Sequence, residues 1–267
     1  MKRSRFLILA ALSIACTDAT MPRAINLSAP RTTELVSVSA TEAVLPSAYT
    51  TVMGETNNNF PHSFKNLRYQ QVFSGSDVVN PTLIGLCLRR DNLFGGVERI
   101  QTLTVKLGPT SLDYTTLGSN FAANYSAAPT QVFSGDVVIP ASSGNGTPTD
   151  FDLCIPFSAP YSHPAGSNII VEVLNTSSVS GNVPRDACDG AAATCTTSRA
   201  FAFSATAETA ALVQRGGLVM KFVSPEPPKP VDPVTKDECM RGGWIDFEFR
   251  NQGQCVRFVE TGIDSRG

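Results

Sequence analysis

Apolar residues recur at every second position along most of this chain, and this pattern restricts the fold more than any other feature of the sequence. Residues 102–107 alternate strictly, and residues 84–89 and 151–157 repeat the spacing. Successive side chains of a β-strand point to opposite faces, so a period of two predicts strands with one buried face. The segments expected to form strands are residues 67–73, 84–89, 102–107, 131–139, 151–157, 168–174, 199–203 and 217–222.

Clusters of Gly, Pro, Asn and Ser separate these segments, as in residues 141–148. A parallel sheet is excluded because no helical pattern of about 10–15 residues lies between successive segments. The sequence therefore predicts an all-β fold, an antiparallel β-sandwich or jelly roll, over residues 45–223.

A proline-rich run follows this predicted domain. Residues 224–234 contain five prolines, a composition typical of an extended linker between domains. Residues 235–267 are then expected to form a separate, small helical module. About thirty residues cannot bury a self-sufficient core, so a disulfide within this module is expected to stabilise it.

Capping signals predict two short helices in the module. Thr235 and Glu238 have the spacing of a capping box, which satisfies backbone N–H groups at a helix start. Asn251 is suited to cap a second helix that ends at Gly262.

The N-terminus carries the signals of export. Three basic residues precede an apolar run that is too short to cross a bilayer, so residues 1–15 are expected to be a signal peptide. The sequence Ser13-Ile-Ala-Cys16 resembles a bacterial lipobox, in which the cysteine is lipidated and becomes the mature N-terminus. Ser13 departs from that motif, which usually has Leu there. Ordinary cleavage that leaves Cys16 unmodified is the alternative.

Charge and composition limit the partners of the mature chain. Residues 16–44 are expected to be a tether, with an edge strand over residues 34–39 as the alternative. Removing residues 1–15 takes three of 21 basic residues, and 18 against 23 acidic residues leaves a net charge of −5. This balance excludes a strongly basic nucleic-acid-binding protein.

Seven cysteines are an odd number, which suggests that one has a separate role. Lipid on Cys16 leaves six, an even set suited to an oxidising compartment. Two enclose a short loop rich in Gly and Ala, two lie in the C-terminal module, and the last two lie on the polar faces of alternating strands. The predicted disulfides are Cys87–Cys154, Cys188–Cys195 and Cys239–Cys255. Metal ligation is the alternative, but short Cys-x-x-Cys-like spacings are missing from the sequence.

Residues suited to catalysis are few. His62 and His163 each adjoin a proline and are expected to be exposed in turns. Asp150 and Asp152, like residues 246 and 248, have the spacing of acids on the solvent face of a strand. The alternative is a carboxylate pair for glycoside hydrolysis or Ca²⁺ binding. We therefore predict no catalytic residue, no metal ligand and no cofactor.

Five aromatic residues are candidates for a sugar-stacking platform, although aromatics form only 8% of the chain and most are expected in the core. The sequence assigns no residue to ligand binding. Asn124 and Asn175 begin glycosylation sequons, but the bacterial export signals argue against modification. The five aromatic candidates are Tyr69, Tyr114, Tyr125, Tyr161 and Trp244.

Two family resemblances follow from local motifs. Residues 57–61 (NNNFP), 67–73 (LRYQQVF) and 84–91 (IGLCLRRD), with residues 201–222, resemble the secreted domain of PEP-CTERM, exosortase-sorted surface proteins over about residues 45–223. The sequence departs from that family after Pro225-Glu-Pro, because no apolar helix with a basic end follows. Residues 236–256 (KDECMRGGW, then FRNQGQCV) resemble a short C-terminal module of exported bacterial proteins. Both resemblances imply an extracellular, β-rich surface protein.

The first functional hypothesis is accordingly a non-catalytic exported protein of the cell envelope, anchored in the membrane through lipid on Cys16. The second is a carbohydrate-binding or adhesive module whose partner is an extracellular glycan or a surface protein. A hydrolase with a dispersed site is the third. The expected location is the cell envelope, as an outer-membrane lipoprotein, or the extracellular space, and nucleic acid is not an expected partner.

Overall fold

The computed structural model describes residues 41–226 and 232–266. The predicted signal peptide, Cys16 and the alternative strand over residues 34–39 lie outside the described residues.

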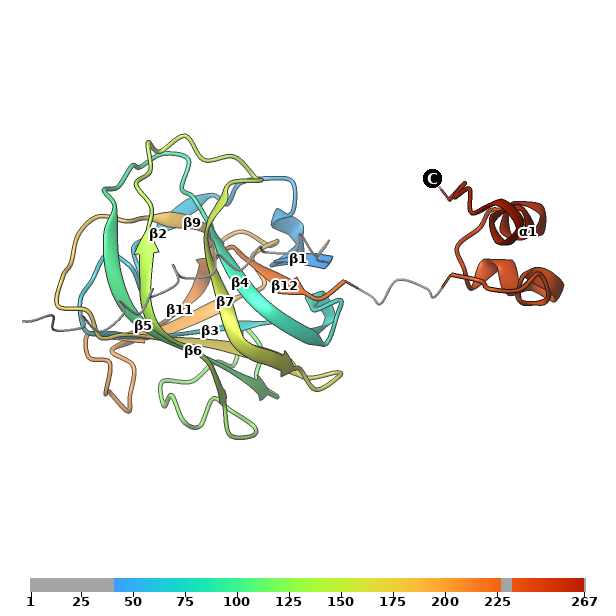
Figure 1. Ribbon diagram of the computed structural model, residues 1–267. Helices are drawn as coiled ribbons and strands as arrows, with labels where there is room; N and C mark the ends of the chain where they lie inside the picture. The colour runs from blue at the N-terminus through green and yellow to red at the C-terminus, as the bar shows by residue number, and fades with distance from the viewer. Residues whose placement is uncertain (1–40, 227–231, 267) are drawn as a thin grey trace, which may run out of the picture. The chain divides into compact units, whose positions relative to one another are not determined.

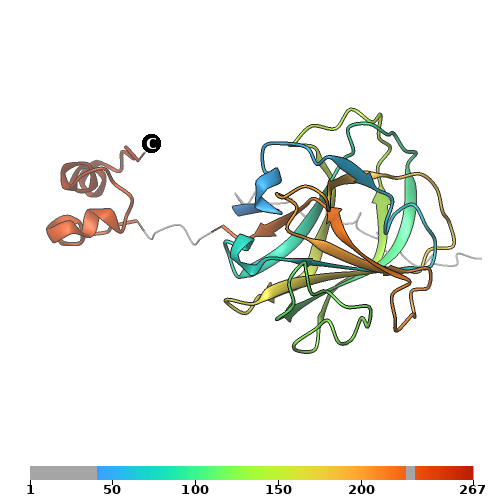
Figure 2. The same cartoon turned by 180° about the vertical axis from the view of Figure 1, so that it is seen from behind.

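Residues 41–226 form two antiparallel sheets, as predicted for an all-β sandwich (Figures 1 and 2). The smaller sheet has the order β1 (Thr41–Leu45), β12 (Met220–Ser224), β4 (Thr82–Arg89), β7 (Phe151–Ser162). The larger sheet has the order β2 (Thr56–Asn58), β9 (Arg185–Asp189), β11 (Leu212–Leu218), β10 (Ser198–Ala202), β3 (Leu67–Phe73), β8 (Asn168–Asn175), β5 (Arg99–Thr110), β6 (Thr130–Ile139). Two short 3₁₀ turns, η1 (Ser47–Tyr49) and η2 (Gly75–Asp77), are the helical elements described in this part.

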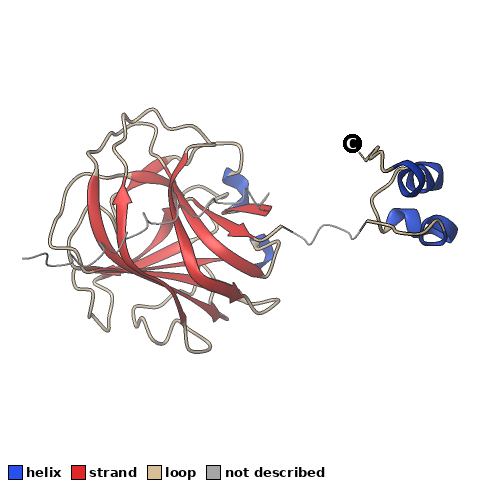
Figure 3. Cartoon of the chain, in the orientation of Figure 1, coloured by secondary structure: helices blue, strands red, loops and turns tan. Residues whose placement is uncertain are grey.

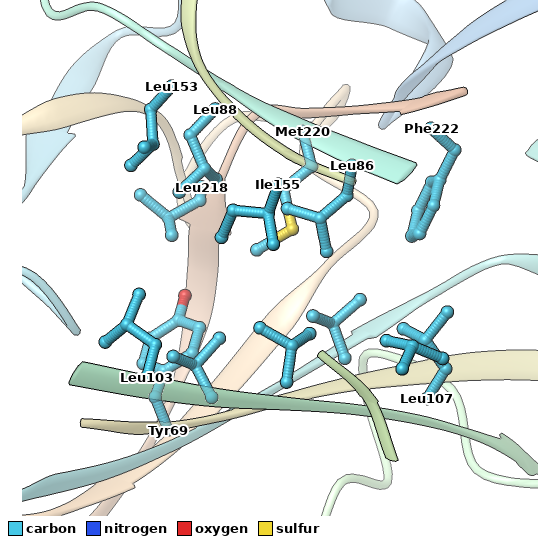
Figure 4. Close-up of a cluster of buried hydrophobic side chains, with 14 of the residues drawn as sticks. Tyr69, Leu86, Leu88, Leu103, Leu107, Leu153, Ile155, Leu218, Met220 and Phe222 are labelled. Atoms are coloured by element: carbon cyan, nitrogen blue, oxygen red, sulfur yellow. The ribbon is translucent and has the colours of Figure 1, made fainter. Parts of the chain in front are cut away.

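The core lies between the facing sides of the two sheets. Leu86, Leu88 and Ile155 of the smaller sheet face Leu103 and Leu107 of the larger sheet (Figure 4). The last two are fully buried, as the alternation of apolar residues requires. A fully buried leucine contributes about 1.5–3 kcal/mol relative to an exposed one, so this layer supplies the main stabilisation of the sandwich.

The prediction of one strand over residues 217–222 is wrong. β11 ends at Leu218 in the larger sheet, and β12 begins at Met220 in the smaller sheet. Leu218, Met220 and Phe222 all belong to the core cluster, so the alternation continues while the chain passes from one sheet to the other. A period of two does not reveal such a crossing.

The ends of the sandwich extend beyond the predicted limits. β1 begins at Thr41, inside the stretch expected to be a tether, and pairs with β12 along its whole length. β12 ends at Ser224, the first residue of the predicted linker.

The C-terminal module contains two short helices (Figure 3). α1 (Gln252–Thr261) begins as predicted, because the Asn251 side chain accepts a hydrogen bond from the Gln254 N–H at 2.9 Å. Gly262 follows with a φ of 69°, the left-handed conformation that glycine adopts most readily. Among the described residues, no helix has the length and apolar character needed to span a membrane.

The other helix, η3 (Asp237–Ile245), is 3₁₀ and is kinked between residues 240 and 242. The predicted capping box is formed in part: the Glu238 carboxylate accepts from the Thr235 N–H at 2.9 Å. Hydrogen bonds from backbone N–H groups to this carboxylate lower the pKa of Glu238. Cys239, Phe249 and Cys255 are the buried residues of this module.

Candidate functional site

Six cysteines pair in the combinations that the sequence predicts. Cys87 is joined to Cys154, Cys188 to Cys195, and Cys239 to Cys255. Cys87 and Cys154 lie directly opposite each other on β4 and β7. Both lie on the face away from the core, as predicted, since their strand neighbours belong to the core cluster. Cys154 is exposed on that face, whereas Cys87 is 3% exposed. Three disulfides indicate an oxidising, extracellular type of environment.

Both histidines are buried, so their expected exposure in turns is wrong. His62 donates from Nδ1 to Gln101 Oε1 at 3.0 Å, and burial, with the nearby charge of Arg185, lowers its pKa to about 3. His163 donates from Nε2 to the Ser167 carbonyl at 2.8 Å, and burial lowers its pKa too. The loops that carry the two histidines fold against the sheets. The imidazole rings are neutral there, and their hydrogen bonds hold the loops in place.

The acidic pairs do not form carboxylate dyads. Asp150 precedes β7 and accepts from the Thr147 N–H at 2.8 Å, which stabilises a turn. Asp152 forms ion pairs with Arg90 and Arg185. Residues 246 and 248 are exposed, as expected, but they lie in a turn of the C-terminal module and not in a strand.

A buried ion pair that the sequence analysis missed links the two sheets. The Arg89 guanidinium on β4 lies 2.6 Å from the Asp186 carboxylate on β9, and both side chains are fully buried. Arg89 also donates to the carbonyls of Tyr49 and Val52, and Asp186 accepts from the Gly54 N–H. Burial raises the pKa of Asp186, while the charge of Arg89 acts in the opposite direction. The only signal in the sequence was a charge within an apolar strand.

The five aromatic candidates do not form one platform. Tyr69 and Tyr161 are buried in the core, and Trp244 packs within the C-terminal module. Tyr114 and Tyr125 pack against a second cluster of buried residues, centred on Val72, Phe121 and Ile170.

The two sequon asparagines have structural roles. Asn124 donates to Gln70 Oε1 at 2.9 Å and Asn175 to the Pro61 carbonyl at 3.0 Å. Both side chains are buried. Both amide groups are therefore engaged in contacts within the fold.

The outer face of the larger sheet carries a row of polar and charged side chains. The register sets Gln70 of β3, Glu172 of β8 and Lys106 of β5 side by side on three adjacent strands. Lys106 alternates with the core residues of β5, so this row lies on the face turned away from the core. Arg68, two residues before Gln70, extends the row diagonally.

Glu172 is fully buried at the centre of this row. Its Oε2 accepts from Arg68 Nη2 at 2.8 Å and from Gln70 Nε2 at 2.6 Å. Its Oε1 lies 3.5 Å from Lys106 Nζ and has no hydrogen-bond partner among the described residues. A single carboxylate therefore holds two cations against the sheet, and the three groups carry a net charge of about +1 at neutral pH.

The loop between β5 and β6 folds back over this row. The Phe121 carbonyl accepts from Gln70 Nε2 at 3.0 Å, and the Phe121 ring lies under the Arg68 guanidinium, 4.5 Å from its centroid. Gly108 makes room for Tyr125, because any Cβ at this position would meet the tyrosine ring. The loop thereby places an aromatic side chain beside the charged row.

Between the loop and the sheet lies a cavity of about 360 Å³, here called the Glu172 cavity. Its charged wall is formed by Arg68, Lys106 and Glu172, and its other wall includes Tyr125 and residues 127–129. Arg68 and Lys106 are 17% and 27% exposed, whereas Glu172 is at 0%. A molecule that enters the cavity thus meets two cationic donors, with the carboxylate behind them.

Comparison with known protein families finds no matching family model, and comparison with curated proteins finds no significant match. The assignment of the candidate site is therefore based on its geometry.

Proposed function

We propose that this chain is an exported, non-catalytic protein of the cell envelope, held there by lipid on Cys16. The observation that supports the proposal most strongly is the pairing of the cysteines. Six of the seven are consumed in three disulfides, so Cys16 alone remains for another role. In an oxidising compartment a lipid anchor gives the seventh cysteine a function and removes a reactive thiol.

The physical requirements of such an anchor fit the sequence. One acyl chain binds a membrane only marginally, but the two or more chains of a lipoprotein N-terminus anchor it stably. The polar residues that follow Cys16 then serve as a tether for the sandwich. The resemblance to PEP-CTERM-type surface proteins supports the same location.

The contacts of the titratable groups favour a structural and binding role over catalysis. Both histidines are held neutral and donate to fixed acceptors, and Asp152 and Asp186 are engaged by arginines. A general base must be able to reach and accept a substrate proton. The rings of His62 and His163 are instead hydrogen-bonded to groups that hold loops in place.

Replacement of the anchor residue tests the proposal. In the native host, the wild-type protein should sediment with the envelope and carry the added mass of a diacylglyceryl or triacyl group. Cys16→Ser should appear in the soluble fraction without that mass. Ser13→Leu, which restores the usual lipobox residue, is the matched control and should remain lipidated. A wild-type protein without added mass, or a Cys16→Ser protein that stays with the envelope, would refute lipid anchoring.

A carbohydrate-binding module is the second candidate function, and the Glu172 cavity is the observation that favours it. Pockets of roughly 300–1,000 Å³ with a few convergent polar groups are typical ligand sites, and this cavity of about 360 Å³ falls within that range.

A further inference from the structure

We propose that the Glu172 cavity binds an acidic monosaccharide unit, a uronate, of an extracellular glycan, with Lys106 and Arg68 donating hydrogen bonds to its carboxylate. This inference rests on the second candidate function. It adds the class of ligand, the site and the orientation of the sugar.

The charge in the cavity selects an anionic group. The charged side chains that a ligand reaches first are those of Lys106 and Arg68, because Glu172 is completely buried. Arg68 uses three of its five N–H groups on Glu172 and on the Ala207 carbonyl. Lys106 has three N–H groups, and its one ion pair among the described residues is with Glu172 Oε1 at 3.5 Å. Donors therefore remain for an incoming carboxylate.

Glu172 acts as a positioning residue for these two cations. Its Oε2 fixes the Arg68 guanidinium through two N–H groups, and the stacking of Arg68 on Phe121 holds the same plane. A pre-oriented guanidinium loses less conformational freedom when it binds a carboxylate. The negative charge of Glu172 also limits affinity for highly charged ions, so a single carboxylate suits the site better than a multivalent phosphate.

The remaining wall of the cavity suits a sugar ring. Tyr125, Ala128 and Pro129 also line the cavity and contribute apolar carbon surface to it. Sugar rings expose C–H faces that pack on aromatic and apolar side chains, while their hydroxyl groups accept from lysine and arginine. Because the cavity has room for about one such ring, a single uronate unit meets both walls at once.

Titration of the purified exported protein with sodium glucuronate tests the proposal, with glucose and sodium acetate as matched probes. Glucose lacks the carboxylate and acetate lacks the ring. Glucuronate should bind with a Kd of about millimolar, at least about fivefold more tightly than either probe. In two-dimensional ¹H–¹⁵N spectra the shifts should centre on residues 122–129 and on β5, and added salt should weaken binding.

Two substitutions address the two walls separately. Lys106→Gln should weaken glucuronate binding about tenfold, the effect of losing one charged hydrogen bond. Lys221→Gln is the matched control, because Lys221 is also a partly exposed strand lysine in an ion pair, with Glu42 at 2.8 Å. Ala128→Trp fills the cavity without changing charge and should abolish binding. The thermal melt of each variant confirms that it is folded.

The results also separate this inference from lipid anchoring. Equal binding of glucose, equal binding of acetate, or no binding of glucuronate at roughly 20 mM each overturns the proposal. Full affinity in Lys106→Gln or in Ala128→Trp overturns the assignment to this cavity. Lipid on Cys16 is detected by mass and fractionation, so either proposal can fail while the other stands.

Discussion

The sandwich and the C-terminal module are stabilised in different ways. Among the described residues, the main core cluster of the sandwich contains 24 buried residues and the cluster of the module contains three. Two of those three are the disulfide-bonded Cys239 and Cys255. In the sandwich, disulfides add to a core that is already large enough to fold. In the module, the disulfide supplies two of the three buried residues around which partly buried side chains pack. A disulfide is therefore expected to contribute a larger share of the stability of the module than of the sandwich.

The largest expected effect is the loss of the module when its disulfide is removed. Removing a disulfide from a small domain costs about 2–5 kcal/mol, which a unit of about thirty residues cannot spare. The double variant Cys239→Ala/Cys255→Ala should therefore lose the dispersed amide signals of α1, while the signals of the sandwich remain.

The matched control is Cys188→Ala/Cys195→Ala, which removes a disulfide from the sandwich. Its loop encloses six residues, so the bond restricts the unfolded chain only slightly, and the sandwich should still melt cooperatively. Persistence of the α1 signals in the module variant would contradict the comparison. Both outcomes are read from the same ¹H–¹⁵N spectra.

In the sandwich, the residue pair with the largest expected effect is the buried Arg89–Asp186 ion pair. Asp186→Ala leaves the Arg89 charge buried without its partner and should lower the free energy of unfolding by about 3–5 kcal/mol. Glu42→Ala breaks the exposed pair with Lys221 and should cost less than about 1 kcal/mol. Urea unfolding at neutral pH measures both, and similar midpoints for the two variants would refute a special role for Asp186.

Periodicity predicted the elements with regular alternation and missed those without it. Residues 67–73 were expected to form a strand and are β3 with the same limits. β9 (Arg185–Asp189) was missed because arginine and aspartate side chains are buried along it, through ion pairs with distant residues. β2 was missed because it has only three residues.

The same distinction applies to the candidate site. The disulfides were predictable because the short loop and the separate module left one remaining pair of cysteines. The Glu172 cavity was not, since it depends on the register of β3, β8 and β5, which joins Gln70 and Lys106 to Glu172 across the sheet. An acid in the apolar segment 168–174 was the local signal, and an isolated acid does not identify its neighbours.

The smallest expected effect is a pH dependence of the sandwich between pH 7 and pH 5, because both histidines of the chain lie there and none lies in the module. Burial lowers the pKa of His62 to about 3, from an ordinary value of 6.5. Below pH 6.5 the unfolded chain binds a proton that the folded chain does not. The contribution of neutral His62 to the free energy of unfolding is therefore fully present above pH 6.5. It is lost progressively as the pH is lowered toward 3.

Between pH 7 and pH 5 this linkage should cost the sandwich about 2 kcal/mol from His62 alone. His163, whose pKa is also lowered by burial, contributes in the same direction. His62→Gln should reduce the slope of unfolding free energy against pH, even though the variant is less stable at pH 7. The module signals should change little over this interval and serve as the internal control. An unchanged slope in His62→Gln would show that His62 is not the group whose protonation destabilises the sandwich.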